Sequence, residues 1–384
     1  MRMIRSLVCV AAAALALPPL TARAQETPGE TPSAPEATPG ENVATPEEKA
    51  EPELKVNWKN GKTSIETPNA LLQISNRVQL RWTQDWPETD DATGSFRVRR
   101  AKTKLEGWIY EKRFMYALQL NWADRDNVLE DALIDWDFTG NGLVRATLGQ
   151  FKVPFGRQEL TSSGKQQFVD RAIVSRQFAH GRDVGLRIHG ETSAGRLSWA
   201  AGIFNGSGRD AVVNTDGKYE FDARVQFAPN GDPGYSESDF ESKDRPLYSV
   251  AGQYHHNDVG RNEERVKRST YGFDGVFKFH GVSAFAEAFF SDVTLNTNPA
   301  LVSNGFTVQL GYLFPGRRFE VAGRYSWWDP SDDTDGNDRR ELGGAVSYFR
   351  NEHNLKFQAD LLRVEGGVLE LDDTLLRFQT QFIF

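Results

Sequence analysis

Residues 218–227, KYEFDARVQF, alternate strictly between apolar and polar side chains. One parity holds Tyr219, Phe221, Ala223, Val225 and Phe227, and the other holds Lys218, Glu220, Asp222, Arg224 and Gln226. A period of two residues is the period of a β-strand, so the two sets point to opposite faces of a sheet. In a soluble sandwich the apolar face would pack on a second sheet. In a membrane barrel it would contact lipid, while the charged face would line water.

Segments of this kind recur from about residue 71 to the last residue and predict an all-β chain of about sixteen strands. The predicted strands are 71–83, 95–110, 113–123, 130–138, 142–151, 182–190, 196–204, 218–228, 247–256, 268–279, 281–291, 304–314, 317–328, 340–350, 353–363 and 374–384. An even number of strands is typical of transmembrane antiparallel β-barrels of the outer membrane.

The connections between these strands alternate in length. The short ones are 111–112, 139–141, 191–195, 280–281, 315–316 and 351–352, and longer loops lie between them. Short turns at one end and long loops at the other are typical of a membrane barrel built from consecutive hairpins. Residues 229–245, PNGDPGYSESDFESKDR, occupy a place where a short turn is expected, and we interpret them as a surface insertion.

The first 24 residues have the build of a cleavable secretory signal. Arg2 and Arg5 precede an apolar run, and Ala22-Arg23-Ala24 ends it with small residues around the expected cleavage site. The only cysteine, Cys9, lies in this signal, so the exported chain is expected to have no disulfide and no thiolate metal site. Residues 25–55 are rich in Pro and Glu and predict a disordered periplasmic leader, which leaves residues 56–384 for the barrel domain.

The last predicted strand favours the membrane barrel over the sandwich. It reads LLRFQTQFIF, with Leu376, Phe378, Phe382 and Phe384 on one face, and such an apolar edge would invite pairing in a soluble protein. A terminal strand that ends on an aromatic residue, here Phe384, resembles the signal by which the outer-membrane assembly machinery recognises its substrates. We therefore expect a protein of the Gram-negative outer membrane, in contact with the lipid bilayer and with lipopolysaccharide.

The inward parity carries more basic than acidic groups, although the whole chain has a net charge of -8. Its basic members include Lys102, Lys104, Arg145, Arg187 and Arg224. Charges of one sign on a pore wall select permeants of the other sign, so the pattern predicts a preference for anions. A charge-balanced wall, as in a general porin, is the alternative.

Three segments resemble the phosphate-selective porin O and P family. They are FRVRRAKTKLEGWI at 96–109, LGQFKVPFGRQELTSS at 148–163 and FVDRAIVSRQFAHGRDVGLRIHG at 168–190, and the resemblance is collinear from about Asn69 to Phe384. It implies a homotrimer of sixteen-stranded barrels in which the long loop after the fifth strand folds inward and forms the constriction.

The resemblance also implies which residues bind the anion. At the positions that match the family's constriction, this chain has Arg99, Arg100, Ser162, Ser163, Lys165 and Arg171. Guanidinium groups bind tetrahedral oxyanions through two parallel hydrogen bonds, lysine adds a point charge, and hydroxyls donate without adding charge. By strict alternation Arg99 would point away from Arg100 unless a β-bulge intervenes.

The family's vestibule is lined by an arginine ladder, and its nearest counterpart here is GRNEERVKRS. This segment supplies Arg261, Arg265, Lys267 and Arg268, but Glu263 and Glu264 interrupt it. The interruption leaves open a broader anion or solute channel, or simply a solvated loop.

Other motifs do not support a different chemistry. DPSDDTDGND at 329–338 places Leu342 where a calcium loop needs its bidentate glutamate. HHND at 255–258 lacks an accompanying nucleophile motif, so we predict that the chain is not an enzyme. We also predict no metal site and no cofactor. The chain has no basic module interleaved with aromatic residues, so we predict no nucleic-acid partner. The predicted function is passive diffusion of small anions, with phosphate or pyrophosphate as leading candidates. A general porin of mixed selectivity and a non-conducting structural barrel are the alternatives.

Overall fold

The computed structural model describes residues 54–384, apart from 193–194, 210–212, 243, 261–264, 296–300 and 368–371. These residues form one compact unit. The expectations for the signal at 1–24, and for all but the end of the leader at 25–55, lie outside the described residues.

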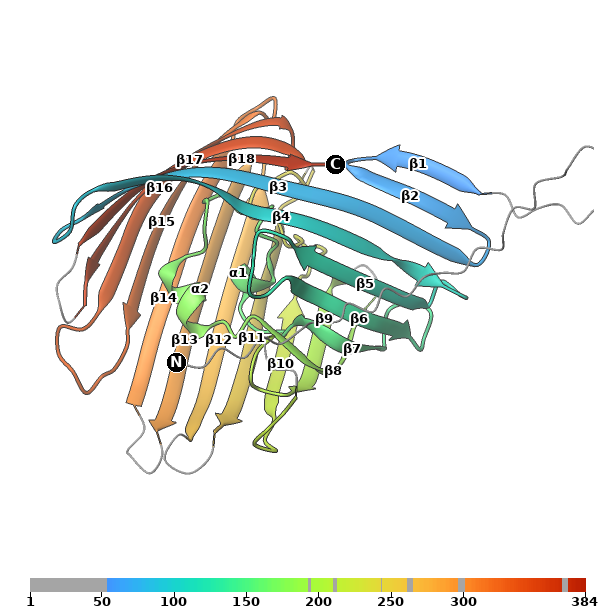
Figure 1. Ribbon diagram of the computed structural model, residues 1–384, viewed down its shortest axis with the longest axis horizontal. Helices are drawn as coiled ribbons and strands as arrows, with labels where there is room; N and C mark the ends of the chain where they lie inside the picture. Colours follow the sequence, from blue (N-terminus) through green and yellow to red (C-terminus); the bar gives the residue numbers. More distant parts are fainter. Residues whose placement is uncertain are drawn as a thin grey trace, which may run out of the picture. The chain divides into compact units, whose positions relative to one another are not determined.

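The described chain forms a closed antiparallel barrel of sixteen strands, β3 to β18 (Figure 1). The strands are β3 (Ala70–Pro87), β4 (Thr93–Ile109), β5 (Phe114–Asn121), β6 (Leu129–Asp137), β7 (Arg145–Lys152), β8 (Arg182–Glu191), β9 (Leu197–Phe204), β10 (Glu220–Phe227), β11 (Leu247–Val259), β12 (Val266–Phe279), β13 (Val282–Leu295), β14 (Leu301–Leu313), β15 (Phe319–Asp329), β16 (Arg339–Asn351), β17 (Leu355–Gly366) and β18 (Asp373–Ile383). Each strand pairs with the next, and β18 pairs back with β3 to close the barrel, with Phe378 opposite Trp82. The predicted strand number and barrel fold are confirmed.

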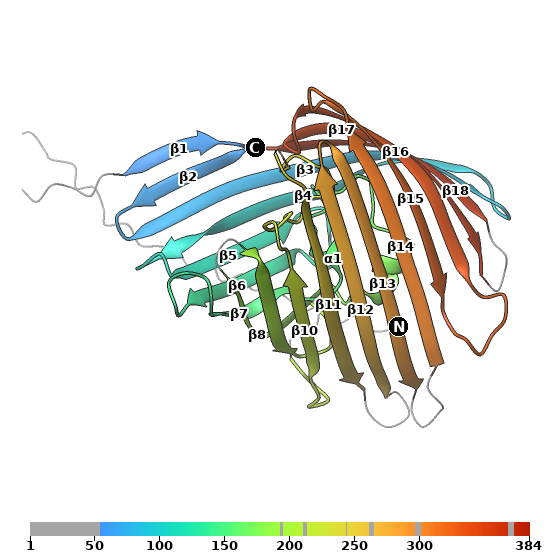
Figure 2. The same cartoon turned by 180° about the vertical axis from the view of Figure 1, so that it is seen from behind.

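A hairpin that was not predicted from the sequence precedes the barrel. It consists of β1 (Lys55–Lys59) and β2 (Lys62–Thr67), and β2 pairs with the first residues of β3 (Figure 2). Asn60 and Gly61 connect the two strands with positive φ angles of 52° and 73°, as a tight two-residue hairpin requires. The Asn-Gly pair, which is typical of such turns, could have predicted this hairpin from the sequence. β1 begins at the last residue assigned to the leader.

Side chains alternate between the inside and the outside of the barrel, as the sequence predicts. In β10, Glu220, Asp222, Arg224 and Gln226 are buried, whereas Phe221 and Phe227 are 48% and 51% exposed. Phe378 of β18 is likewise 49% exposed, so no second layer of the described chain covers this face. An apolar outer face and a polar inner face fit a barrel surrounded by lipid and exclude the sandwich.

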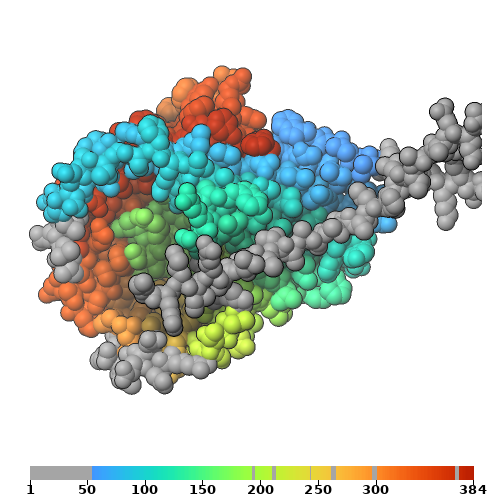
Figure 3. Space-filling view, viewed as in Figure 1, coloured from blue at the N-terminus to red at the C-terminus, as the bar shows by residue number. Residues whose placement is uncertain are grey.

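Residues 153–181, which we call the first inward segment, lie inside the barrel. They include α1 (Arg157–Leu160) and α2 (Ile173–Phe178), which Figure 1 shows within the ring of strands. The Gln167 side chain donates to Ser283 Oγ of β13 at 2.8 Å, and the Val169 amide donates to Asp360 of β17 at 2.9 Å. In Figure 3 the green atoms of this part of the chain are visible inside the opening of the barrel. Among the described residues, no helix is long and apolar enough to cross a membrane.

An apolar cluster anchors the first inward segment to one side of the wall. Its buried members are Phe151, Val153, Phe155, Ile173, Val174, Phe178, Phe204 and Phe289. Phe178 of α2 stacks on Phe289 of β13, with ring centroids 5.1 Å apart. Apolar burial therefore holds this segment at α2, and polar contacts hold it elsewhere.

The second inward segment, 229–245 without the undescribed residue 243, folds into the barrel through its buried middle, so its interpretation as a surface insertion was wrong. Ser236, Glu237, Ser238 and Asp239 are all buried. The Glu237 amide donates to the Lys165 carbonyl at 3.0 Å, and Ser238 Oγ donates to Glu320 of β15 at 2.8 Å. The physical reason is that a barrel of this kind has a polar interior, which offers partners to Ser, Asp and Glu side chains.

We predict that a charge on the outer face of the barrel destabilises it. Phe273 lies in the middle of β12 with 57% of its surface exposed. Phe273→Arg should lower the free energy of unfolding in lipid vesicles by about 2–4 kcal/mol, because a buried arginine side chain is costly near the centre of a bilayer. Denaturant titration measures the change, and Phe273→Leu is the matched control. Equal stability of the two variants would contradict the lipid-facing assignment.

Candidate functional site

A β-bulge in β4 brings two neighbouring arginines to the inside of the barrel. Gln79 of β3 pairs with Arg100, whereas Leu80 pairs with Val98, so Arg99 is the extra residue. A bulge of this kind re-aims a side chain that strict alternation would send to the other face. Both arginines therefore face the lumen.

Four arginines surround the carboxylate of Asp170 in the first inward segment. Arg81 of β3 lies at 2.5 Å and Arg377 of β18 at 3.4 Å, while Arg99 and Arg100 lie at 3.7 and 3.8 Å. Burial alone would raise the pKa of the Asp170 carboxyl, but the hydrogen bond and charge of Arg81, with the charges of Arg99 and Arg377, lower that pKa well below its usual range. The carboxylate is therefore ionised at neutral pH, and one negative charge faces four positive ones.

Arg99 and Arg100 line a cavity of about 550 Å³ between the first inward segment and the wall. Ten basic residues line it: Arg77, Arg99, Arg100, Lys102, Lys104, Lys152, Arg171, Arg182, Arg187 and Arg209. Only three acidic residues line it: Asp124, Glu130 and Asp131. The cavity also takes in Ser162 and Ser163, so eight of the residues singled out from the sequence lie together here.

Some of the basic side chains in this cavity are neutralised by carboxylates and some are not. Lys102 pairs with Glu130, and Arg182 contacts Asp131 at 2.7 Å. Arg77 and Arg187 form no ion pair with a carboxylate of the described chain. Arg77 instead donates to Ser162 Oγ and Ser163 Oγ, at 2.8 and 3.2 Å.

Arg187 is held by contacts that leave its charge uncompensated. One nitrogen donates to Thr147 Oγ1 at 3.0 Å, and the guanidinium lies 4.8 Å from the centre of the Phe151 ring. Hydroxyl and aromatic partners orient a guanidinium without cancelling its charge. Positive charge at Arg77 and Arg187 thus remains available to a ligand.

Arg171 lines the cavity but is engaged with its own segment. Its side chain donates to the carbonyls of Gln158, Glu159 and Thr161 and contacts the Glu159 carboxylate at 3.0 Å. These bonds fix the backbone of α1 and of Thr161, which follows it. Arg171 therefore supports the cavity wall and also adds charge to it.

The other residues singled out from the sequence lie elsewhere. Lys165 is exposed and does not line this cavity. Arg145 and Arg224 line a second cavity of about 280 Å³ with Arg187. Arg145 pairs there with Asp135, and Arg224 makes a bidentate pair with Asp274.

The vestibule residues are not brought together in the described chain. Arg265 contacts Asp258 at 2.6 Å, and Arg268 lines a separate cavity with His180 and His255. Lys267 shares its parity in β12 with the exposed Tyr271 and Phe273, so its assignment to the vestibule was wrong: alternation turns it to the outer face. Arg261 lies outside the described residues.

The family model for phosphate-selective porin O and P matches residues 73–384 of this chain. The chain belongs to this family. A curated relative, an uncharacterized protein of Aquifex aeolicus (strain VF5), is 25% identical to this porin over 286 residues, which cover 67% of this chain and 68% of the relative.

Solved porin structures share the fold at low sequence identity. The anion-selective porin from Comamonas acidovorans matches with a TM-score of 0.59 at 9% identity, over 82% of this chain and 100% of that chain. A trimer form of OmpT from Vibrio cholerae matches with a TM-score of 0.57 at 9% identity, again over 82% and 100% of the two chains. The family and these outer-membrane neighbours place this porin in the outer membrane and indicate a channel rather than an enzyme.

Four basic residues of the cavity were not predicted from the sequence, namely Arg77, Lys152, Arg182 and Arg209. Arg77 shares its parity with the buried Gln79 and Arg81, so alternation within β3 could have found it. Lys152 and Arg182 have outward parity in β7 and β8, but they stand at the strand ends where the chain turns into the barrel. Alternation carries no information at such ends.

We predict that Asp170 is essential to the stability of the arginine cluster. Asp170→Asn leaves the buried Arg81 without a carboxylate partner in the described chain, whereas Arg377 keeps its pair with Asp360. Loss of one partner from a buried pair costs about 3–5 kcal/mol of unfolding free energy. Denaturant titration of the porin in detergent measures this loss. Asp372→Asn, which breaks an exposed pair with Arg363, is the control and should leave stability nearly unchanged. Equal effects would show that the cluster is not coupled to folding.

Proposed function

We propose that this porin passes small anions by passive diffusion, with phosphate or pyrophosphate as the leading candidates. The observation that carries the proposal is the excess of ten basic over three acidic residues around the 550 Å³ cavity. The chain as a whole is acidic, so this excess is local. A pore wall of one charge concentrates permeants of the opposite charge and repels the others.

The geometry at the bulge supports weak, exchangeable anion binding. Arg99 and Arg100 lie 3.7 and 3.8 Å from Asp170, beyond a hydrogen bond. Arg100 donates one hydrogen bond to Gln79 Oε1 at 2.9 Å, and its remaining donors and those of Arg99 are left for an incoming oxyanion. Arg77 and Arg187 add charge further along the same cavity. Several moderate sites in series allow an anion to enter and also to leave, which conduction requires.

The other features expected from the sequence belong to the same proposal. The first inward segment would form the constriction, with Ser162, Ser163 and Arg171 on its cavity side. The solved trimer form of OmpT supports a homotrimer. The shared fold of the anion-selective porin from Comamonas acidovorans supports an anion preference. Export by a cleaved signal, contact with lipopolysaccharide and recognition of the Phe384 strand by the assembly machinery complete it.

The second inward segment favours one alternative, a barrel that conducts poorly or not at all. It packs on the first segment, since Gln158 Nε2 donates to Glu237 at 3.0 Å and Arg157 donates to the Gly234 carbonyl at 2.6 Å. Together the two segments fill part of the lumen. Planar-bilayer recording separates this alternative from an open channel, and a reversal potential in a chloride gradient separates anion from mixed selectivity.

We predict that phosphate blocks chloride current through this porin and that the bulge arginines are needed for the block. Arg99→Ala and Arg100→Ala should each raise the phosphate concentration for half-block about tenfold, since a hydrogen bond to a charged group is worth about 1.5–3 kcal/mol. Lys267→Ala is the matched control, because it removes one positive charge from the outer face. Unchanged block in both arginine variants would refute the binding assignment, and cation preference of the wild-type channel would refute the anion proposal.

We further predict that the second inward segment narrows the channel. Replacement of residues 229–245 by a short Asn-Gly turn should raise the single-channel conductance, because it removes the buried residues 236–239 from the lumen. Removal of the exposed residues 332–336 is the control and should leave conductance unchanged. If the replacement variant is folded and conducts like the wild type, the segment lies off the permeation path.

A further inference from the structure

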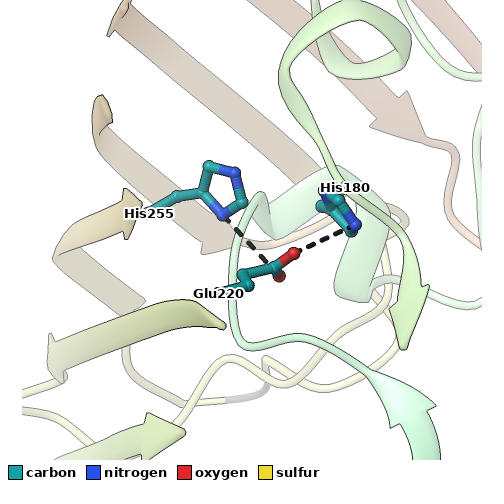
Figure 4. Close-up of side chains that lie close together, drawn as sticks. All are labelled: His180, Glu220 and His255. Carbon is teal, nitrogen blue, oxygen red and sulfur yellow. Dashed lines mark ion pairs between the residues drawn. The ribbon is translucent and has the colours of Figure 1, made fainter. Parts of the chain in front are cut away.

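Two histidines and a glutamate from distant parts of the chain meet inside the barrel (Figure 4). His180 lies between α2 and β8, Glu220 opens β10, and His255 lies in β11. His180 Nε2 is 3.0 Å from Glu220 Oε2, and His255 Nδ1 is 3.7 Å from Glu220 Oε1. One ligand atom from each residue can be chosen so that all three lie within 4.8 Å of one another.

A second carboxylate belongs to the same cluster. Asp222 follows Glu220 on the inward face of β10, and its Oδ1 is 3.0 Å from His255 Nδ1. Glu220 is 0% exposed and Asp222 is 3% exposed. Two buried carboxylates thus share a site with two imidazoles, of which His180 is the more exposed.

The buried carboxylates have no fixed cation to balance them. Among the described residues, no lysine or arginine forms an ion pair with Glu220 or Asp222, whose charged partners are His180 and His255. Neither oxygen of Glu220, nor Oδ2 of Asp222, accepts a well-aligned hydrogen bond. A buried carboxylate without donors is costly, whereas a bound cation would satisfy these oxygens.

A cavity gives an ion access to the cluster. It has a volume of about 600 Å³ and is lined by His180 and His255. Its other walls come from the long-loop end of the barrel: residues 206–208, Asn257, Val259, Val266 and Arg268. Arg268 is the only charged group among these lining residues apart from the histidines. Arg268 therefore places one positive charge beside the path of an ion that enters through this cavity, but it is not one of the candidate ligands.

We propose that His180, Glu220 and His255 bind a divalent transition-metal ion, for which Zn²⁺ is the best fit. Imidazole nitrogens with a carboxylate oxygen are a ligand set that zinc favours, and the carboxylate of Asp222 stands next to them as a fourth ligand. Tetrahedral zinc at about 2.0–2.1 Å from each ligand needs ligand atoms about 3.4 Å apart. The contacts of the two histidines with Glu220, 3.0 and 3.7 Å, bracket that separation. The two imidazole nitrogens lie within 4.8 Å of each other, so side-chain adjustments that draw them together complete the site.

Such an ion would have a structural role, holding the first inward segment against the barrel wall, and would take no part in permeation. His180 ends the first inward segment, and Glu220 and His255 belong to the wall at β10 and β11. One ion would therefore tie the segment to the wall close to the Phe178–Phe289 contact. The site is independent of the basic cavity, because the two cavities share no lining residue.

The test uses the full porin, purified in detergent without a polyhistidine tag and stripped with a chelator. Zn²⁺ titration followed by calorimetry should show one saturable site per chain, and Zn²⁺ should raise the thermal unfolding temperature. Co²⁺ in place of Zn²⁺ should give the d–d absorption of a four-coordinate or five-coordinate ion with nitrogen ligands.

Substitutions locate the site. His255→Ala and His180→Ala should each weaken Zn²⁺ binding by roughly 100-fold or more, since even loss of a partner outside the ligand sphere costs about 10–100-fold. His256→Ala is the matched control. This neighbour in β11 has the opposite parity and hydrogen-bonds Ser269 Oγ at 2.9 Å, so binding should be unchanged.

Glu220→Gln, which keeps the side-chain shape, should also weaken binding and guards against a variant that simply fails to fold. Heat-modifiable migration on gels reports whether each variant is folded. Absence of saturable binding to the wild type, wild-type affinity in folded His255→Ala or Glu220→Gln, or an equal loss in His256→Ala would each overturn the proposal.

Discussion

Backbone hydrogen bonding is the constraint on which the rest of this porin depends. A sheet surrounded by lipid has no water to satisfy its edges, so β18 must return to β3 and close the ring. Closure fixes one face of every strand toward lipid and the other toward the lumen. Because the lumen is lined by buried polar side chains, each charged residue that alternation sends inward must then find a partner there or remain available to a permeant.

The interior is organised by the way these charges are shared. Asp170 is held among four arginines, whereas Arg77 and Arg187 keep hydroxyl and aromatic partners. The first inward segment supplies the acidic centre and the second supplies Glu237, so both segments are held as much by polar contacts as by apolar packing. A polar core of this kind lets a channel wall carry excess positive charge while most of the interior stays paired.

Much of the fold could be predicted from sequence, because a period of two residues identifies a strand and also its outward face. The sixteen strands, the exposure of Phe221 and Phe378, and the family follow from that pattern and from collinear motifs. The pattern does not predict geometry where alternation is broken. Sequence could name the need for a bulge at Arg99 but could not place it, since register depends on the partner strand.

The candidate site was predictable only in part for the same reason. Eight of the residues named from the sequence share one cavity, but Lys152 and Arg182 join them through strand ends that period-two reasoning cannot orient. The second inward segment was missed because its polar composition is equally suited to solvent and to a polar lumen. The meeting of His180, Glu220 and His255 depends on the register of β10 with β11 and on the path of the chain before β8, which alternation does not specify.

The hairpin of β1 and β2 protects the barrel from edge-to-edge aggregation with other copies of the chain. β3 begins at Ala70, but β18 pairs with it only from Arg77 onward, and β2 pairs with the stretch from Ala70 to Ile74. Without β2, the backbone amide and carbonyl groups at the start of β3 would be unpaired and could hydrogen-bond to a strand of another chain. The hairpin therefore covers the hydrogen-bonding edge of β3 where the barrel closes. A chain that lacks the residues before Ala70 would still close its barrel but would tend to aggregate with other copies as it assembles.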